Sequence, residues 1–254
     1  MNDVILGDCL EKMKDIPDNK ISLCVTSPPY NIDKEYESKM EINEYVFWCI
    51  NWINEIYRIT KPNGSFWLNL GYFEIPTKGK CVPIPYLLWD KTPFYLLQEI
   101  VWYYKAGVAT KNYFSPRNEK WLWFVKNPDN YIFNLDSIRD KNVRYPNQKK
   151  NGKLKCNPLG KNPTNVWEIP KITSGKNRAS KERVNHPAQF PLQIIERIIK
   201  GCSNKSDLIL DPFAGSGTTG LACVNLNRNY ILIEKEEKYY NIINERLNTL
   251  NNNK

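Results

Sequence analysis

The chain has 254 residues, of which 41% are hydrophobic and 25% are charged. This length suffices for one large domain with a real core, and the composition excludes a disordered tail or a membrane protein. No stretch approaches the roughly 18 apolar residues of a membrane span, and Met1–Leu6 lack the basic and long apolar regions of a signal peptide. We therefore expect a cytoplasmic protein without a membrane partner. Seven cysteines, none in a C-x-x-C pair, indicate reduced thiols and no metal site.

The excess of positive charge is concentrated in one stretch of the sequence. The net charge is +9, from 36 Lys and Arg against 27 Asp and Glu. Residues 105–183 hold 18 basic and 6 acidic side chains, a net of +12, so the remaining chain carries 9 − 12 = −3. This distribution is typical of a polyanion-binding segment on a near-neutral body. A generally lysine-rich proteome is the alternative explanation and stays open.

Strands and helices alternate in the first part of the chain. The apolar run Val4–Leu6 precedes a short helix from about Cys9 to Met13, and Ile21–Val25 has the composition of a buried strand. That strand ends before Pro28, because proline has no backbone N–H and excludes the residue before it from the helical conformation. Further along, the pattern predicts a helix over Ile42–Ile59, a turn at Lys61–Gly64, a strand over Ser65–Leu70, a helix over Pro85–Trp89, and strands over Gln98–Tyr103 and Trp121–Val125.

The periodicity is lost from about residue 128 to residue 185, where Lys, Asn, Pro and Gly are frequent. This composition predicts a loop-rich basic region with little core of its own. Beyond it, the pattern predicts a helix from Leu192 to about Gly201, a strand over Leu208–Leu210, a helix over Leu221–Leu226, a strand over Tyr230–Ile233 and a helix over Tyr239–Leu250. Strands that alternate with helices predict an α/β fold with a mostly parallel sheet and helices on both faces.

A glycine-rich turn joins the strand at Leu208–Leu210 to the next helix. Gly215, Gly217 and Gly220 spell G-x-G-x-x-G, and glycines let the backbone approach a ligand closely at a helix N-terminus. Glu234, at the end of the following strand, is placed to accept the two hydroxyls of a ribose. Taken alone, these features fit a dinucleotide and a nucleoside cofactor equally well.

Two further features favour a cationic nucleoside cofactor. Asp211 precedes the glycines, and its negative charge would repel a pyrophosphate but would suit an ammonium or similar cation. The segment Thr26–Tyr30, with the sequence Thr-Ser-Pro-Pro-Tyr, also follows a strand. Because the carboxyl ends of strands share one edge of a doubly wound sheet, we expect this loop and the glycine turn to face one cleft.

Together, Thr26–Tyr30 and Asp211–Gly217 resemble the motifs of the amino-group DNA methyltransferases. The catalytic loop precedes the cofactor loop, with a basic region between them, as in the permuted beta group of that family. Smaller matches are Gly7-Asp8, Lys61–Gly64 (with Asn63 in place of a glycine) and His186–Pro191. The resemblance implies a Rossmann-like fold with a seven-stranded sheet, the cofactor S-adenosylmethionine and a place in a restriction–modification system. It divides the chain into a catalytic half (1–127), a target-recognition region (128–185) and a cofactor-binding half (186–254).

The resemblance also implies roles for individual residues. Ser27 and the Pro28 carbonyl would hydrogen-bond the target amine, and Tyr30 would stack on a base flipped out of the duplex. The catalytic residues are thus Ser27, Pro28, Pro29 and Tyr30, and the cofactor-binding residues are Asp8, Asp211, Phe213, Ala214, Gly215, Ser216, Gly217, Thr218 and Glu234. No Pro-Cys dipeptide occurs, which excludes the C5-cytosine enzymes. Ser27, where adenine-N6 enzymes tend to have aspartate, favours cytosine N4.

The sequence also indicates partners and leaves alternative functions open. Double-stranded DNA is the expected substrate, and a cognate restriction endonuclease and a homodimer are open alternatives for partners. The candidate DNA-binding residues are Lys149, Lys150, Lys153, Lys155, Lys176, Arg178, Lys181 and Arg183. Four rivals stay open: an adenine-N6 methyltransferase, an NAD-dependent oxidoreductase, a catalytically silent DNA-binding subunit, and an enzyme acting on RNA or protein.

Overall fold

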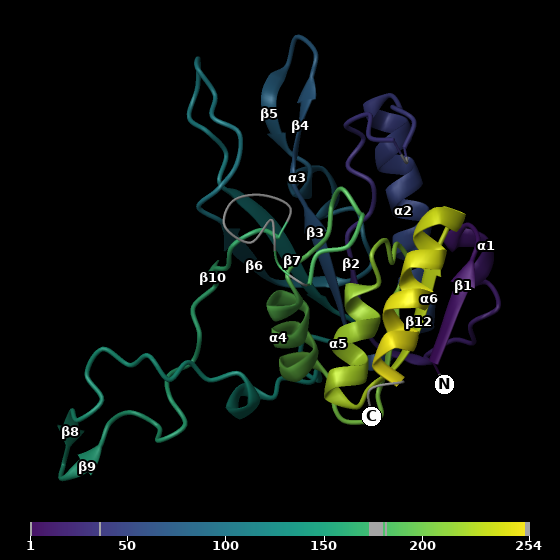
Figure 1. Cartoon of the computed structure of the whole chain (residues 1–254). Helices are drawn as coiled ribbons and strands as arrows, with labels where there is room; N and C mark the ends of the chain where they lie inside the picture. The colour runs from purple at the N-terminus through teal and green to yellow at the C-terminus, as the bar shows by residue number, and fades with distance from the viewer. Residues whose placement is uncertain (1, 36, 173–179, 181, 252–254) are drawn as a thin grey trace.

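The computed structural model describes residues 2–35, 37–172, 180 and 182–251, and an eight-stranded sheet runs through its centre (Figure 1). In spatial order the strands are β1 (Asn2–Leu6), β12 (Asn229–Glu234), β11 (Leu208–Asp211), β2 (Ile21–Thr26), β3 (Thr60–Leu70), β7 (Asn118–Val125), β6 (Tyr95–Tyr103) and β10 (Val166–Glu168). All neighbours are parallel except that β7 is antiparallel to both β3 and β6. The prediction of a mostly parallel α/β sheet is confirmed.

The number of strands differs from the expected seven. The additional edge strand is the three-residue β10, which lies within the segment predicted to be loop-rich and pairs with β6 from Val166↔Val101 to Glu168↔Tyr103. Trp167 of β10 is buried, as is Ile169 beyond it. A three-residue strand is too short to show periodicity, so only its pairing with β6 identifies it.

Helices cover both faces of the sheet, as predicted. The helices α1 (Cys9–Met13), α2 (Ile42–Ile59) and α3 (Pro85–Leu88) pack on one face, and α4 (Leu192–Cys202), α5 (Thr218–Leu226) and α6 (Glu237–Asn251) pack on the other. The long helix α2 buries residues at helical spacing, among them Cys49, Trp52 and Ile56, which are 0% exposed. Burying this apolar stripe stabilises the helix more than its intrinsic propensity does. No helix among the described residues is both long enough and apolar enough to span a bilayer.

The predicted turn at Lys61–Gly64 is a bulge within β3. Ile21 of β2 pairs with Thr60, and Leu23 pairs with Ser65, so two steps along β2 correspond to five along β3. A Cβ at Gly64 would lie 3.0 Å from the Ser22 carbonyl oxygen, so only glycine allows this approach. The strand therefore continues through a sequence that is typical of a turn.

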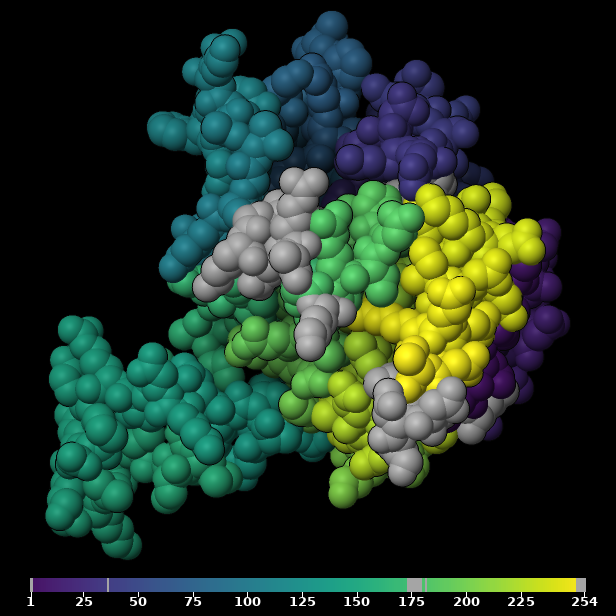
Figure 2. Space-filling model, viewed as in Figure 1, coloured from purple at the N-terminus to yellow at the C-terminus, as the bar shows by residue number. Residues whose placement is uncertain are grey.

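Three elements project from the body, and the first two were not predicted, whereas the third lies within the predicted loop-rich region 128–185. The hairpin of β4 (Tyr72–Ile75) and β5 (Gly79–Pro83) rises beside β3, and a loop of residues 104–117 links β6 to β7 at the same end of the molecule (Figures 1 and 2). A longer arm leaves the body beside α4, after the short 3-10 helix η1 (Leu135–Ser137). It ends in the small hairpin of β8 (Lys149–Lys150) and β9 (Lys153–Leu154).

Helix α5 packs closely on the sheet through Gly220. A Cβ at this position would lie 2.6 Å from Leu232 Cδ1, and Leu232 is 0% exposed. We therefore expect Gly220→Ala to lower the free energy of unfolding by about 1–3 kcal/mol, because overpacking outweighs the gain in helix propensity of roughly 1 kcal/mol. Urea unfolding measures this difference.

Gly201→Ala is the matched control, because Gly201 also lies in a helix, but a Cβ there would lie 3.2 Å from Ile138 Cδ1. This variant should leave the free energy of unfolding unchanged or raise it. Equal destabilisation by both variants would show that close packing at Gly220 is not the cause.

Candidate active site

The carboxylate of Asp211 joins the two motifs that the sequence singles out. Its Oδ1 accepts a hydrogen bond from Thr26 Oγ1 (2.6 Å) and one from the Phe213 N–H (3.2 Å), and its Oδ2 accepts from Thr219 Oγ1 (2.6 Å). These donors come from the end of β2, from the glycine turn and from the first turn of α5. Burial raises the pKa of Asp211 to about 6, while the hydrogen bonds oppose this shift. The two loops therefore meet at one edge of the sheet, as predicted.

The glycine turn has the left-handed backbone that its sequence indicates. Gly215 has φ = 52° and Gly217 has φ = 73°, and α5 begins directly after Gly217, three residues earlier than the sequence predicted. Glu234 holds the turn to the end of β12, since its Oε2 accepts from the Gly215 N–H (2.7 Å) and its Oε1 from the Glu236 N–H (2.9 Å). Burial raises the pKa of this carboxyl.

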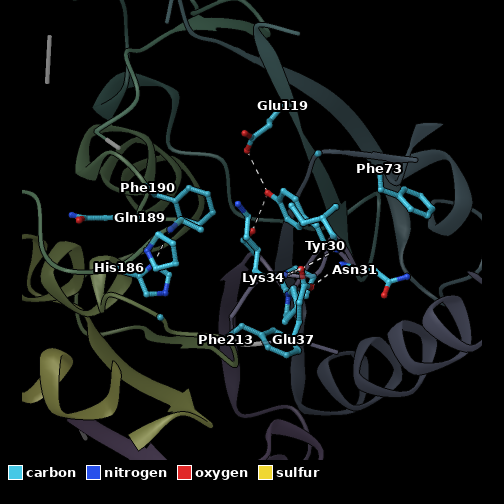
Figure 3. Close-up of a pocket in the computed structure, with 18 of the residues that line it drawn as sticks. Tyr30, Asn31, Lys34, Glu37, Phe73, Glu119, His186, Gln189, Phe190 and Phe213 are labelled. Carbon is cyan, nitrogen blue, oxygen red and sulfur yellow. Dashed lines mark hydrogen bonds between the residues drawn. The ribbon is translucent and has the colours of Figure 1, made fainter. Parts of the chain in front are cut away.

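A cavity of about 1020 Å³ opens between these loops, and both motifs line it (Figure 3). The predicted site residues that line it are Asp8, Ser27, Pro28, Pro29, Tyr30, Asp211, Phe213, Ala214, Gly215, Ser216, Thr218 and Glu234. Gly217 lies behind the wall, where a Cβ would be 3.1 Å from Ile243 of α6. Its part is thus to shape the turn. Figure 3 shows Tyr30 across the cavity from His186 and Phe190.

Asp8 and Phe213 also line the cavity, and contacts with helices α1 and α2 hold them. Asp8 follows β1 and caps α1, since its Oδ1 accepts from the Leu10 N–H at 2.9 Å. The Phe213 ring packs edge-on against Trp48 and Trp52 of α2, with centroids 5.6 and 5.3 Å apart. Asp8, Glu234 and Asp211 lie at or just after the ends of the neighbouring strands β1, β12 and β11, and all three line the cavity with the Phe213 ring.

The Tyr30 hydroxyl is held by partners from two strands and from its own loop. It accepts from Ser27 Oγ (3.1 Å), donates to Asn69 of β3, and lies 3.3 Å from Oε2 of Glu119 in β7. The other oxygen of Glu119 accepts from Lys171 Nζ at 2.7 Å. The ring itself lies against the backbone at Gly71, where a Cβ would be 2.9 Å away. Tyr30 is therefore fixed in position.

Sequence reasoning missed Asn69, Glu119 and Lys171. Asn69 had a detectable signal, because it is a polar residue within the apolar run Ser65–Leu70, and it is 0% exposed. Glu119 and Lys171 had none, because their place in the site depends on the pairing of β7 with β3 and on the path of the chain after β10.

His186 forms part of the opposite wall as a neutral side chain. Burial lowers its pKa to about 4, its Nδ1 accepts from the Ala188 N–H (3.2 Å), and its ring packs edge-on against Tyr239 at 4.5 Å. Its ring faces Gly215, where a Cβ would lie 2.9 Å from Nε2. These contacts are those of a packing and hydrogen-bonding residue. Within the described ranges, no three His, Cys, Asp or Glu residues are grouped as a metal site would require.

The predicted DNA-binding residues are not gathered at the cavity. Lys149, Lys150, Lys153 and Lys155 are exposed at the tip of the arm, and none of them lines the cavity. Arg183 is exposed just before the cavity-lining segment 186–190. Lys176, Arg178 and Lys181 lie outside the described residues.

The fold is that of the methyltransferases. It superimposes with a TM-score of 0.74 on the PvuII DNA methyltransferase (cytosine-N4-specific), at 22% identity, over 99% of this chain and 91% of that one. It also matches the complex of M1.HpyAVI with S-adenosylmethionine, with a TM-score of 0.66 and 26% identity, over 98% of this chain and 100% of that one.

The chain belongs to the DNA methylase family (N6_N4_Mtase), whose model matches residues 21–245. It is 59% identical to the type II methyltransferase M.ScaI of Streptomyces caespitosus over 248 residues, which are 97% of this chain and 82% of that one. It is 32% identical to the DNA adenine methyltransferase YhdJ of Escherichia coli (strain K12) over 245 residues, 93% of this chain and 79% of that one. Membership of this family removes the support for an NAD-dependent oxidoreductase.

The family uses S-adenosylmethionine, and the cavity fits this cofactor. S-adenosylmethionine carries a positive sulfur, an ammonium group and a ribose diol. Asp8, Asp211 and Glu234 supply three carboxyl groups to the cavity. Phe213 and the side-chain-free Gly215 supply an apolar surface and room for close approach.

We expect Asp211→Asn to weaken the binding of S-adenosylmethionine by about 10–100-fold, because a charge-assisted contact contributes roughly 1.5–3 kcal/mol. Asparagine keeps an oxygen that can accept from one of the two threonines. Because the pKa of Asp211 is about 6, the affinity of the unmodified protein should also fall as the pH drops below that value. Titration calorimetry from pH 5 to pH 8 measures both effects.

Unfolding experiments supply the control for this variant. The native pKa lies above the ordinary value of 3.8, so the native state binds more protons between about pH 4 and pH 6. The contribution of Asp211 to the free energy of unfolding therefore falls as the pH rises through this window, and the asparagine variant should lack that fall. An unchanged dissociation constant with the same pH profile would exclude contact between Asp211 and the cofactor.

Proposed function

We propose that this DNA methyltransferase transfers a methyl group from S-adenosylmethionine to the N4 amine of cytosine at a specific site, within a restriction–modification system. The observation that carries the proposal is the meeting of the Thr26–Tyr30 loop and the Asp211 turn in one cavity, joined by the Thr26–Asp211 hydrogen bond of 2.6 Å. Such a cavity can hold the methyl donor and the target base against each other. The cytosine-N4 specificity in the name of the PvuII enzyme agrees with the presence of Ser27 here.

The cofactor-binding roles follow from the carboxyl groups and the shape of the turn. When bound, S-adenosylmethionine supplies a methyl group on a positively charged sulfur. Asp211 faces its ammonium or sulfonium region, and Asp8 lies near its adenine or amino group. Glu234 already accepts two backbone N–H groups, yet a carboxylate has about four lone-pair sites, so it can also accept from the ribose hydroxyls. The remaining contacts are those of Phe213, Ala214, Gly215, Ser216 and Thr218, while Gly217 shapes the turn.

Ser27 is oriented to act as a hydrogen-bond acceptor. The lone pair of an exocyclic amine is conjugated into its ring, so the amine is a poor nucleophile until its nitrogen becomes more pyramidal. Ser27 Oγ donates its proton to the Tyr30 hydroxyl, which leaves its lone pairs for a proton of the target amine. The Pro28 carbonyl accepts the other amine proton. The adjacent Pro29 carbonyl is held by the Tyr45 hydroxyl at 2.7 Å, which fixes the loop. No covalent enzyme intermediate is needed.

Tyr30 serves as the platform for the target base. A base inside a duplex is out of reach of the cavity, so it must be flipped out of the stack. The hydroxyl contacts and the backbone at Gly71 hold the Tyr30 ring, which lines the cavity and can stack on the flipped base. A fixed ring loses little conformational entropy on binding, which favours the extruded state.

Adenine-N6 methylation is the alternative on the same scaffold. The relative YhdJ, at 32% identity, is named a DNA adenine methyltransferase. The neutral Ser27 favours cytosine, because a hydroxyl both donates and accepts, and cytosine has the acceptor N3 beside its amine. Only the product distinguishes the two bases.

The proposal extends to partners and to the division of the chain. Double-stranded DNA is the substrate, the arm lysines and Arg183 contact its phosphates, and a restriction endonuclease cuts the same site in unmodified DNA. Residues 1–127 supply the catalytic loop, residues 128–185 the target-recognition region, and residues 186–254 the cofactor turn. The cytoplasm, where DNA and S-adenosylmethionine meet, is the proposed location.

Sequencing of DNA from cells that express the chain, with a readout of methylation type and position, tests the function. N4-methylcytosine at one short recurrent sequence is the expected result. N6-methyladenine would overturn the base assignment and leave the reaction class intact. The absence of any DNA methylation would overturn the proposed function.

Ser27→Ala should lower the rate of methyl transfer far more than it lowers DNA affinity, because its hydrogen bond strengthens as the amine nitrogen rehybridises. Single-turnover assays on duplex DNA measure the rate, and thermal melting confirms folding. A folded Ser27→Ala protein as fast as the unmodified enzyme would exclude Ser27 from the chemistry.

Substitutions of Tyr30 separate stacking from hydrogen bonding. Tyr30→Ala should lose about 1–3 kcal/mol of stacking, which lowers both base capture and rate. Tyr30→Phe keeps the ring but removes the partner of Ser27, so it should retain base capture and much of the activity. Equal loss in both variants, measured by DNA affinity and single-turnover rate, would contradict a stacking role.

Replacing Lys149, Lys150, Lys153 and Lys155 together with Ala should flatten the dependence of DNA affinity on salt, because each phosphate contact releases a counterion. Titrations of duplex DNA at several salt concentrations measure the slope. Affinity for S-adenosylmethionine should not change, since none of the four lines the cavity. An unaltered slope would show that these four lysines do not contact the DNA phosphates.

A further inference from the structure

The loop of residues 104–117 carries the most exposed large apolar side chains in the described part of the chain. Phe114 is 99% exposed, Val108 is 87% exposed and Tyr113 is 45% exposed. They lie within seven residues on a loop that projects from the carboxyl end of β6 (Figure 1). Exposed apolar side chains that gather on one projecting loop are typical of a contact surface for a partner.

The loop holds these side chains out by its own hydrogen bonds. The Thr110 N–H donates to Ser115 Oγ at 3.0 Å, and the Thr110 hydroxyl donates to the Tyr113 carbonyl. Arg117 donates to the Val108 carbonyl at 3.1 Å and to the Pro116 carbonyl at 2.8 Å. Gly107, with φ = 154°, makes room for this guanidinium, which would lie 3.1 Å from a Cβ there. The tip of the loop is therefore shaped around Phe114.

The charge of the loop selects a polyanionic partner. Its charged residues are Lys105, Lys111 and Arg117, with no acidic residue between them. Lys105 pairs with Glu168 at 2.5 Å, Lys111 is exposed, and the bonds of Arg117 to carbonyl groups leave its charge uncompensated. Exposed apolar side chains among basic ones match a duplex, which has phosphates outside and stacked bases inside.

The loop also stands at the mouth of the cavity. Tyr113 and Pro116 line the cavity together with Tyr30 and Glu119, and Lys80 of the β4–β5 hairpin lines it as well. Figures 1 and 2 show the loop and the hairpin projecting at the same end, while the arm with β8 and β9 projects at the other end of the molecule. A duplex whose target base enters the cavity must therefore pass this loop.

We propose that the 104–117 loop contacts the duplex beside the target and that Phe114 inserts into the base stack, in the space that the flipped base leaves. Val108 supports it, and Lys111 and Arg117 contact the flanking phosphates. This inference rests on the proposed function, because it requires base flipping. Flipping exposes the faces of the neighbouring bases, and an apolar side chain that covers them offsets part of the cost of unstacking.

The test compares Phe114→Ala with the unmodified chain on two duplexes that carry its own methylation site. One is fully paired, and the other lacks the base opposite the target, so that the target is already loosened. We expect kcat/KM on the paired duplex to fall by on the order of tenfold or more. On the second duplex it should fall clearly less. A fluorescent base analogue at the target position should report less flipping in the variant.

Two further variants keep this test specific. Phe114→Leu retains an apolar wedge and should restore most of the activity. Tyr95→Ala removes a ring that is 53% exposed at the opposite end of β6, and it should change neither rate nor flipping. Melting temperature and affinity for S-adenosylmethionine should not change in Phe114→Ala, since this side chain is 99% exposed.

The possible failures can be told apart. Equal loss on both duplexes would overturn insertion and assign the loop to general DNA binding. No loss on either duplex would overturn the proposal and direct the search to a protein partner for this loop. If the unmodified chain methylates neither duplex, the proposed function itself fails.

Discussion

Asp211 is the buried charge on which the active site depends. An isolated carboxylate in a protein interior is strongly disfavoured, so its position is set by the donors that surround it. Here the donors are Thr26 at the end of β2, Thr219 in α5 and the Phe213 N–H. Because β2 and β11 are adjacent and parallel, this one group brings together loops that are 185 residues apart. Ser27 and the glycine turn follow these anchors by one to four residues, which fixes the distance between the Thr26–Tyr30 loop and the glycine turn.

Under the proposed function, the same carboxylate connects the fold to the cofactor. Its pKa of about 6 shows that two hydroxyls and one N–H do not fully compensate for burial. A cation bound beside Asp211 would favour the charged form and lower this pKa, so the proposed contact implies that cofactor binding near pH 6 releases protons. The protein's own hydrogen bonds therefore hold the loops, while a positively charged ligand would complete the electrostatic balance.

The sequence predicted the parts of the site that depend on local patterns. The order of strands and helices, the glycine turn and the Thr26–Tyr30 loop each have a signature in adjacent residues, and parallel topology places them at one edge. The contacts of Tyr30 with both Asn69 and Glu119 could not be predicted from adjacent residues. They form only because β7 pairs antiparallel with β3. Likewise, Lys61–Gly64 has the composition of a turn, but the pairing of β2 with both sides of it keeps it within one strand.

The positive charge of residues 105–183 does not by itself indicate where each part of this stretch lies in the fold. Residues 105–183 form one excess of charge in the sequence, yet the fold separates them into a loop at the cavity, an arm at the other end and a segment that precedes the wall near His186. Phosphate contacts are independent of sequence and can be made at several places along a duplex. Under the proposed function, the arm lysines contribute affinity without touching the reaction, whereas the 104–117 loop acts where the duplex is deformed. Net charge alone cannot distinguish these roles. A basic segment far from the cavity can add only to DNA affinity, whereas one beside the cavity can also help to extrude the target base.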